Sequence, residues 1–123
     1  MPTSTIQEVA SYLREIKLIL QGSPSNDARF IVATVRGKNI ETLSTLEYDT
    51  EDVKNTILSL SSTDYPSGPI KDNAIKGDLW VFGKIIKGRE VYIKLKIQGD
   101  NRYKQVSVLS FHFSEQRLQY PLR

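Results

Sequence analysis

A strand-like segment in the last third of the chain carries polar side chains suited to contact with a phosphate backbone. Over residues 90–97 an apolar and a polar set of side chains alternate: Val91, Ile93, Leu95 and Ile97, and Tyr92, Lys94 and Lys96. Because successive strand residues point to opposite faces, one face is expected to be apolar and the other cationic. Side chains on one face recur at roughly 6.6 to 7 Å, close to the spacing of successive backbone phosphates. The simpler alternative is a solvated face, where lysines are common.

The single histidine of the chain lies in a neighbouring strand-like segment, residues 105–113. Ser110 and His112 share one face of this segment, while Leu109, Phe111 and Phe113 share the other. In an antiparallel meander the face of His112 can coincide with the face of Tyr92. Imidazole is the side chain best suited to move protons near neutral pH, so His112 is a candidate general acid or base. A lone histidine is more often structural, and this alternative stays open.

Lys84 lies near the end of a third strand-like segment, residues 79–86, and the face on which it lies depends on the following turn. A two-residue turn at residues 87–88 places Lys84 opposite Val91 on the apolar side. A three-residue loop that includes Arg89 places Lys84 opposite Tyr92 on the cationic face. We expect the second arrangement, in which Lys84 joins the cationic face.

The positive charge of the chain is concentrated near its C-terminus. The net charge is +3; residues 1–83 contain 8 Lys/Arg and 11 Asp/Glu, a net charge of −3, whereas residues 84–123 contain 9 and 3, a net charge of +6. This asymmetry is typical of a surface that binds phosphate groups, and a protein partner with an acidic segment would use the same field.

Length and composition restrict the class of protein. The 123 residues, 39% apolar and 25% charged, predict one globular domain over residues 1–123. Cysteine is absent and histidine occurs once, so disulfides, thiolate sites and histidine-rich metal cages are excluded, and we expect neither a metal nor a cofactor. No apolar stretch approaches the roughly 20 residues of a membrane span, and residues 1–4 lack a basic start, so we expect a cytoplasmic protein without a membrane partner.

The N-terminal half predicts mainly helices. A capping box at residues 4–7 and apolar residues at steps of three and four predict a helix that ends near Gln21. A β-branched apolar run predicts a short strand over residues 30–35. Two further helices are expected, one capped by Asn39 and one capped by Thr50.

The C-terminal half predicts a small sheet. Residues 61–78 are rich in Ser, Pro, Gly and Asp and predict a long, mobile loop. Residues 79–86, 90–97 and 105–113 predict an antiparallel meander, with the tail at residues 117–122 packed back across it. The expected fold class is α+β, with N-terminal helices packed on a small, mainly antiparallel sheet.

Four short motifs, in this order and spacing, resemble a known family. They are Arg36-Gly37-Lys38-Asn39, Leu60-Ser61-Ser62-Thr63-Asp64-Tyr65, Glu90-Val91-Tyr92-Ile93-Lys94 and Ser110-Phe111-His112. Together they resemble the MqsR (motility quorum-sensing regulator) family of toxins from toxin–antitoxin pairs, over roughly residues 29–113. The resemblance implies a RelE-like fold, cleavage of RNA, and inhibition by a cognate antitoxin.

The resemblance also implies roles for individual residues. Tyr92 matches the functional tyrosine of the family, and His112 stands where the family often has a catalytic lysine. Other RelE-like toxins use a histidine on the C-terminal strand, so this departure keeps acid–base chemistry. Two further functional residues of the family have no counterpart in this chain. The family's lysine that follows its Asp-aromatic pair falls near Ser67, and its glutamine that follows a tryptophan falls near Val81. Serine and valine cannot perform these roles.

Lys84 or Lys71 could replace the missing lysine. The candidate catalytic residues are His112, Tyr92 and Lys84, and the candidate phosphate-binding residues are Lys94, Lys96 and Lys71.

The implied reaction needs no metal and no protein nucleophile. The 2′-hydroxyl of RNA attacks its own phosphate, an acid protonates the leaving 5′-oxygen, and cations stabilise the charge on the phosphate oxygens. The expected activity is that of an endoribonuclease that stops translation. The alternative is a non-catalytic RNA-binding, ribosome-binding or protein-interaction module with the same basic sheet.

Overall fold

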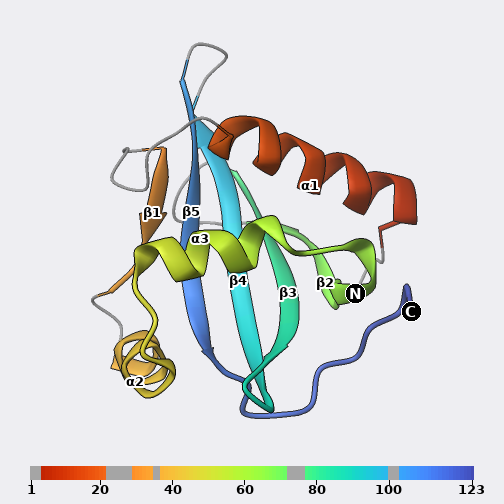
Figure 1. The fold of residues 1–123 in the computed structure, drawn as a ribbon. Coiled ribbons are helices and arrows are strands. Elements are labelled where there is room, and N and C mark those ends of the chain that lie inside the picture. The colour runs from red at the N-terminus through yellow and green to blue at the C-terminus, as the bar shows by residue number, and fades with distance from the viewer. Residues whose placement is uncertain (1–3, 22–28, 35–36, 72–76, 100–102) are drawn as a thin grey trace.

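The computed structural model describes residues 4–21, 29–34, 37–71, 77–99 and 103–123. In chain order the elements are α1 (Ile6–Leu20), β1 (Phe30–Val32), α2 (Gly37–Leu46), α3 (Thr50–Leu58), the 3₁₀ helix η1 (Ser62–Asp64), β2 (Ser67–Lys71), β3 (Asp78–Ile86), β4 (Arg89–Gly99) and β5 (Lys104–Phe113). The five strands form a mixed sheet in the order β1-β5-β4-β3-β2 (Figure 1). The predicted α+β class, with N-terminal helices packed on the sheet, is confirmed.

The sheet is a meander with one parallel strand added. β2, β3, β4 and β5 are antiparallel to their neighbours in turn, as predicted for the last three, and β1 is parallel to β5. Helices α1 and α3 lie across one face of the sheet, and α2 lies beyond its β1–β5 side (Figure 1). The core lies between the sheet and α1 and α3; its largest buried side chains include Ile16, Ile57, Phe82, Ile93 and Phe111.

Helix α1 begins one residue later than the predicted capping box. Thr5 is the N-cap, and its hydroxyl and the Glu8 carboxylate each accept from the other residue's backbone N–H, at 3.1 and 2.8 Å. Ser4 is instead buried, because its N–H donates to the Tyr65 hydroxyl and its own hydroxyl donates to the Gly68 carbonyl. A distant contact therefore moves the cap from Ser4 to Thr5.

The caps expected for the next two helices are also wrong. Asn39 lies inside α2, which begins at Gly37, and its side chain is buried against the sheet. In α3 the N-cap is Asp49, not Thr50, because Asp49 and Asp52 form a reciprocal capping box. The start of α3 moves by one residue, within the usual uncertainty of helix ends, whereas α2 begins three residues earlier than expected.

The long loop expected over residues 61–78 contains regular structure. It includes η1 and the edge strand β2, and only residues 72–76 lie outside the described residues. The sequence concealed β2 because Gly68 and Pro69 have low strand propensity. An edge strand tolerates proline, since one side of it needs no hydrogen-bond donor, and the pairing with β3 is irregular between Ser67 and Ile70.

The β3–β4 turn places Lys84 on the apolar face, against our expectation. Ile86 and Arg89 form the last strand pair, so the turn is the two-residue segment 87–88, and both of its residues have positive φ, 51° and 82°. Two-residue turns of this kind match the twist of the flanking strands. Lys84 consequently pairs with Val91, on the side of the sheet that faces the core.

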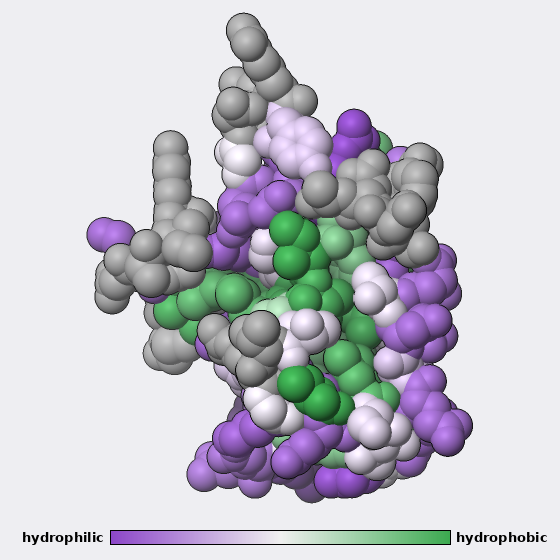
Figure 2. Space-filling view, turned by 90° about the vertical axis from the view of Figure 1, so that its left-hand side faces the viewer, coloured by the Kyte–Doolittle hydropathy of each residue, from purple (hydrophilic) through white to green (hydrophobic). Residues whose placement is uncertain are grey.

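Apolar residues gather on the side of the molecule that carries β1 and α2 (Figure 2). Ile31 of β1 and Ile40 of α2 are 44% and 50% exposed. Exposed apolar patches are frequent at surfaces that contact other proteins.

No helix within the described ranges is long and apolar enough to cross a membrane.

Candidate functional site

A cleft of about 590 Å³ opens on the sheet face opposite α1 and α3. The side chains on its strand floor are Tyr92 and Lys94 of β4 and Ser110 and His112 of β5. The first turn of α2 forms one wall, and the C-terminal tail (residues 114–123) forms the other. The volume lies within the usual range of ligand sites.

Tyr92 and His112 are directly opposite each other on neighbouring strands. Their rings are stacked, with centroids 5.2 Å apart and planes inclined by 19°. The expectation that both lie on the same polar face of adjacent strands is therefore confirmed. The pair offers an imidazole and a phenol to one ligand group in the cleft.

A backbone contact orients the imidazole of His112. Nδ1 lies 3.0 Å from the carbonyl oxygen of Phe113. A carbonyl oxygen only accepts, so this hydrogen bond keeps a proton on Nδ1, and in the neutral ring the lone pair is on Nε2. Nε2 is then the atom that accepts a proton from a ligand.

Tyr92 is suited to the opposite role. Burial raises the pKa of its phenol above the ordinary value, because the charged phenolate loses hydration. The hydroxyl therefore stays protonated across neutral pH and donates a hydrogen bond. The stacked pair thus combines a proton acceptor, His112, with a proton donor, Tyr92.

Three basic side chains lie around the pair. Lys94 is on the cleft floor opposite Ser110, as predicted, and Lys38 extends from the first turn of α2. Arg89 lies beside His112 in an adjoining hollow that Lys38 also lines. Its guanidinium carbon is 3.5 Å from the centre of the Phe113 ring.

Lys38 also joins the two walls of the cleft through an exposed ion pair with Glu115 of the tail. The sequence reasoning missed Lys38 and Arg89 as site residues. The only sign of Lys38 in the sequence is its place in the motif at residues 36–39. No local sequence pattern predicts that Arg89 lies near His112.

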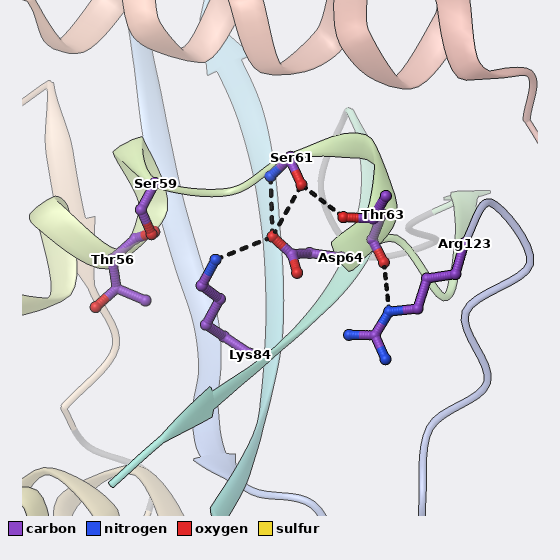
Figure 3. A network of polar contacts seen from close by, with 7 residues as sticks. All are labelled: Thr56, Ser59, Ser61, Thr63, Asp64, Lys84 and Arg123. Atoms are coloured by element: carbon purple, nitrogen blue, oxygen red, sulfur yellow. Dashed lines mark hydrogen bonds and ion pairs between the residues drawn. The ribbon is translucent and has the colours of Figure 1, made fainter. Parts of the chain in front are cut away.

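Lys84, expected to be catalytic, lies on the opposite face of the sheet. Its ammonium group is 3.2 Å from an Asp64 carboxylate oxygen that also accepts from the Ser61 backbone N–H at 3.0 Å (Figure 3). The ion pair therefore attaches η1 to β3. The hairpin register, not the chemistry of lysine, removes Lys84 from the cleft.

Two predicted phosphate ligands lie outside the cleft as well. Lys96 is 1% exposed, so the expectation of an exposed Lys96 on a cationic face is wrong. Lys96 pairs with Ser107 on β5, and a Cβ at Gly77 would lie only 3.7 Å from Cδ of Lys96. Lys71 is exposed at the end of the edge strand β2 and does not line the cleft. The row of Tyr92, Lys94 and Lys96 is thus reduced to its first two members.

The C-terminal tail packs back onto the sheet, as expected from its amphipathic sequence. Glu90 of β4 holds it, because its carboxylate accepts from the Ser114 hydroxyl at 2.8 Å, the Leu118 backbone N–H at 3.0 Å and the Tyr120 hydroxyl at 2.7 Å. A side chain at Gly83 would collide with Leu118 and Tyr120, so glycine permits this close approach. The tail wall of the cleft is therefore built from specific contacts.

Among the described residues no group of three or more His, Cys, Asp or Glu side chains is placed to hold a metal ion. The expectation of a metal-independent site stays a prediction.

Comparison of the chain with protein-family models, with curated proteins and with solved structures finds no match.

Proposed function

We propose that this protein is a metal-independent endoribonuclease, and that it acts as the toxin of a bacterial toxin–antitoxin pair. The observation that carries the proposal is the stacked pair of Tyr92 and His112, at 5.2 Å, in a cleft that Lys38 and Lys94 also line. A proton acceptor, a proton donor and cations around one cavity are the groups that phosphodiester cleavage by the RNA 2′-hydroxyl requires. The motif resemblance to the MqsR family supports the same activity.

The proposed reaction uses the two rings in turn. Nε2 of His112 removes the proton of the 2′-hydroxyl, the 2′-oxygen forms a bond to the adjacent phosphorus, and the bond from phosphorus to the 5′-oxygen breaks. The Tyr92 hydroxyl gives its proton to the leaving 5′-oxygen and regains one from water, while His112 loses its proton to water. The products are a 2′,3′-cyclic phosphate and a 5′-hydroxyl.

The basic side chains of the cleft stabilise the charge that develops on the phosphate oxygens. In this proposal Lys94 and Lys38 contact the reacting phosphate, and Arg89 contacts a neighbouring phosphate. They replace Lys84, Lys96 and Lys71, because those three lysines lie outside the cleft. Binding of Lys38 to phosphate exchanges one anionic partner for another, since Glu115 is its partner in the free protein.

The partners and the compartment follow from the same proposal. The substrate is messenger RNA, free or on the ribosome, so the protein acts in the cytoplasm. A cognate antitoxin neutralises it, and the apolar patch near β1 and α2 offers a protein-binding surface beside the cleft, since β1 pairs with β5 and α2 forms one cleft wall. Co-expression with the product of an adjoining reading frame should restore growth and yield a complex that purifies as one species.

The direct test is cleavage of a short RNA by the purified protein in the presence of a metal chelator. The expected products end in a 2′,3′-cyclic phosphate, and His112→Ala should reduce the rate by at least about 100-fold, the low end for a lost general acid or base. Lys71→Ala is the matched control, because it removes an exposed cation outside the cleft and should leave the rate unchanged. Full activity of a folded His112→Ala variant would overturn the mechanism.

RNA that binds the cleft but stays intact would support the alternative of a non-catalytic binding module. Binding that depends on Lys94 and Lys38, without any cyclic phosphate product, is the result that would identify such a module.

A further inference from the structure

The outer edge of β5 changes its partner halfway along the strand. β1 pairs only with Val106, Ser107 and Val108 of β5. Farther along, side chains of helix α2 take over the hydrogen bonds that a strand would make. The buried amide of Asn39 and the hydroxyl of Thr42 make these bonds.

Asn39 is 0% exposed and makes three hydrogen bonds to backbone groups. Its Nδ2 donates to the carbonyl oxygens of Ala33 at 2.7 Å and Leu109 at 3.1 Å, and its Oδ1 accepts from the N–H of Phe111 at 3.1 Å. The hydroxyl oxygen of Thr42 accepts from the N–H of Phe113 at 3.1 Å. The backbone on both sides of His112 is thus fixed from α2.

The bonds of Asn39 surround a β-bulge. Lys94 pairs with Ser110 while the next residue of β4, Leu95, pairs with Val108, so Leu109 is an extra residue in β5. A bulge of one residue reverses the faces of all side chains beyond it. Regular alternation from Val108, which is buried in the core, would otherwise direct His112 toward the core.

We propose that Asn39 and Thr42 are positioning residues that hold the Leu109 bulge and thereby keep His112 in the cleft, stacked on Tyr92. This inference rests on the proposed function for its effect on catalysis, but its structural part does not. Beside β1 the outward backbone groups of β5 are the N–H of Val106 and the carbonyl of Val108, which bond to Arg29 and Ala33. Asn39 instead binds the carbonyl of Leu109 and the N–H of Phe111, and this change from even- to odd-numbered residues requires one extra residue in the strand. Thr42 holds the next outward amide, that of Phe113, whose carbonyl orients the imidazole.

The first test follows the imidazole itself. His112 is the only histidine, so its ring proton signals in an NMR spectrum are unambiguous. The facing Tyr92 ring should displace these signals from the positions of a free imidazole, and Tyr92→Leu should remove that displacement. Asn39→Ala should remove most of it as well, and Thr42→Val should reduce it. Unchanged histidine signals in both α2 variants would overturn the inference, whether or not the protein cleaves RNA.

The second test separates positioning from general stability. Thr42→Val keeps the shape of the side chain and removes the hydroxyl acceptor. It should lower kcat for RNA cleavage about tenfold, with KM changed less than twofold. Thr42→Ser keeps the hydroxyl and should have the kcat of the parent protein. Ser44→Ala, at an exposed position on the same helix that lines neither the cleft nor the adjoining hollow, is the control and should have no effect. If Asn39→Ala fails to fold, the Thr42 series alone decides.

The outcomes distinguish this inference from the proposed function. Loss of activity in His112→Ala together with full activity in Thr42→Val and Asn39→Ala would overturn only the positioning role. Histidine signals that lose their displacement in the α2 variants, with no RNA cleavage by the parent protein, would support the positioning role and overturn the proposed function.

Discussion

The ammonium group of Lys84 lies 3.2 Å from the carboxylate of Asp64, on the face of the sheet opposite Tyr92. The side chains of this pair are 31% and 10% exposed, so the pair is partly shielded from water. It attaches η1 to β3, within the network drawn in Figure 3. The sequence suggested a catalytic lysine at this position, whereas its surroundings make it structural.

Lys84→Met should therefore lower stability and leave the chemistry intact. Removal of the ammonium group leaves the nearly buried Asp64 carboxylate with one partner fewer, which typically costs about 1–3 kcal/mol of unfolding free energy. Urea denaturation should detect this loss, while the rate of RNA cleavage by the folded variant should stay within about twofold of the parent. A loss of cleavage comparable to that of His112→Ala would return Lys84 to the active site.

The hydroxyl and the ring of Tyr92 should contribute separately. Tyr92→Phe keeps the ring against His112 but removes the proton donor, so kcat should fall by about 100-fold while KM changes little. Tyr92→Leu should lower kcat as much and also weaken RNA binding, since the stacking surface is lost. Single-turnover cleavage and a binding titration measure the two effects. Full activity of Tyr92→Phe would show that the ring only stacks.

RNA binding should weaken with salt, and the cleft lysines should account for part of this dependence. Each phosphate contact with a single strand contributes about 0.7 to the slope of log K against log salt, because counterions are released. Lys94→Ala and Lys38→Ala should each reduce the slope by about this amount. Lys71→Ala removes the same charge outside the cleft and is expected to keep the slope of the parent; an equal reduction in all three variants would indicate non-specific binding.

The attachment of the tail should depend on pH through Glu90. Burial alone would raise the pKa of this carboxyl, but hydrogen bonds from Tyr120, Leu118 and Ser114 outweigh it and leave the pKa below the ordinary value. A carboxyl whose pKa is lower in the folded state stabilises the fold above its unfolded pKa, and this contribution disappears as the pH falls through the folded pKa. The tail should therefore stay attached at neutral pH and detach in acid.

Glu90→Gln is the variant that tests this dependence. The difference in unfolding free energy between the parent and Glu90→Gln should be largest near neutral pH and should shrink as the pH falls below about 4. Hydrogen exchange of the tail amides should report the same change locally. A difference that is constant from pH 7 to pH 3 would contradict the role of the ionised carboxylate.

The local pattern of the sequence determined much of this protein. The spacing of apolar residues predicted α1, and alternation in β4 and in the second half of β5 predicted that Tyr92 and His112 lie on the face opposite the core. These features depend on the rotation per residue within one element, so neighbouring residues are sufficient to specify them. For the same reason the α+β class was predictable, while β2 was concealed by its glycine and proline.

The tertiary structure alone decided which polar residues share the cleft. The two-residue turn excluded Lys84, Lys96 is buried outside the cleft, and α2 brought Lys38 to the strand of His112. Strand register, bulge position and helix docking are fixed by how separate segments of the chain pair with one another, and a register shift of one residue reverses every side chain beyond it. The sequence could thus specify that Tyr92 and His112 share a face, whereas only the packed sheet specified which cations surround them.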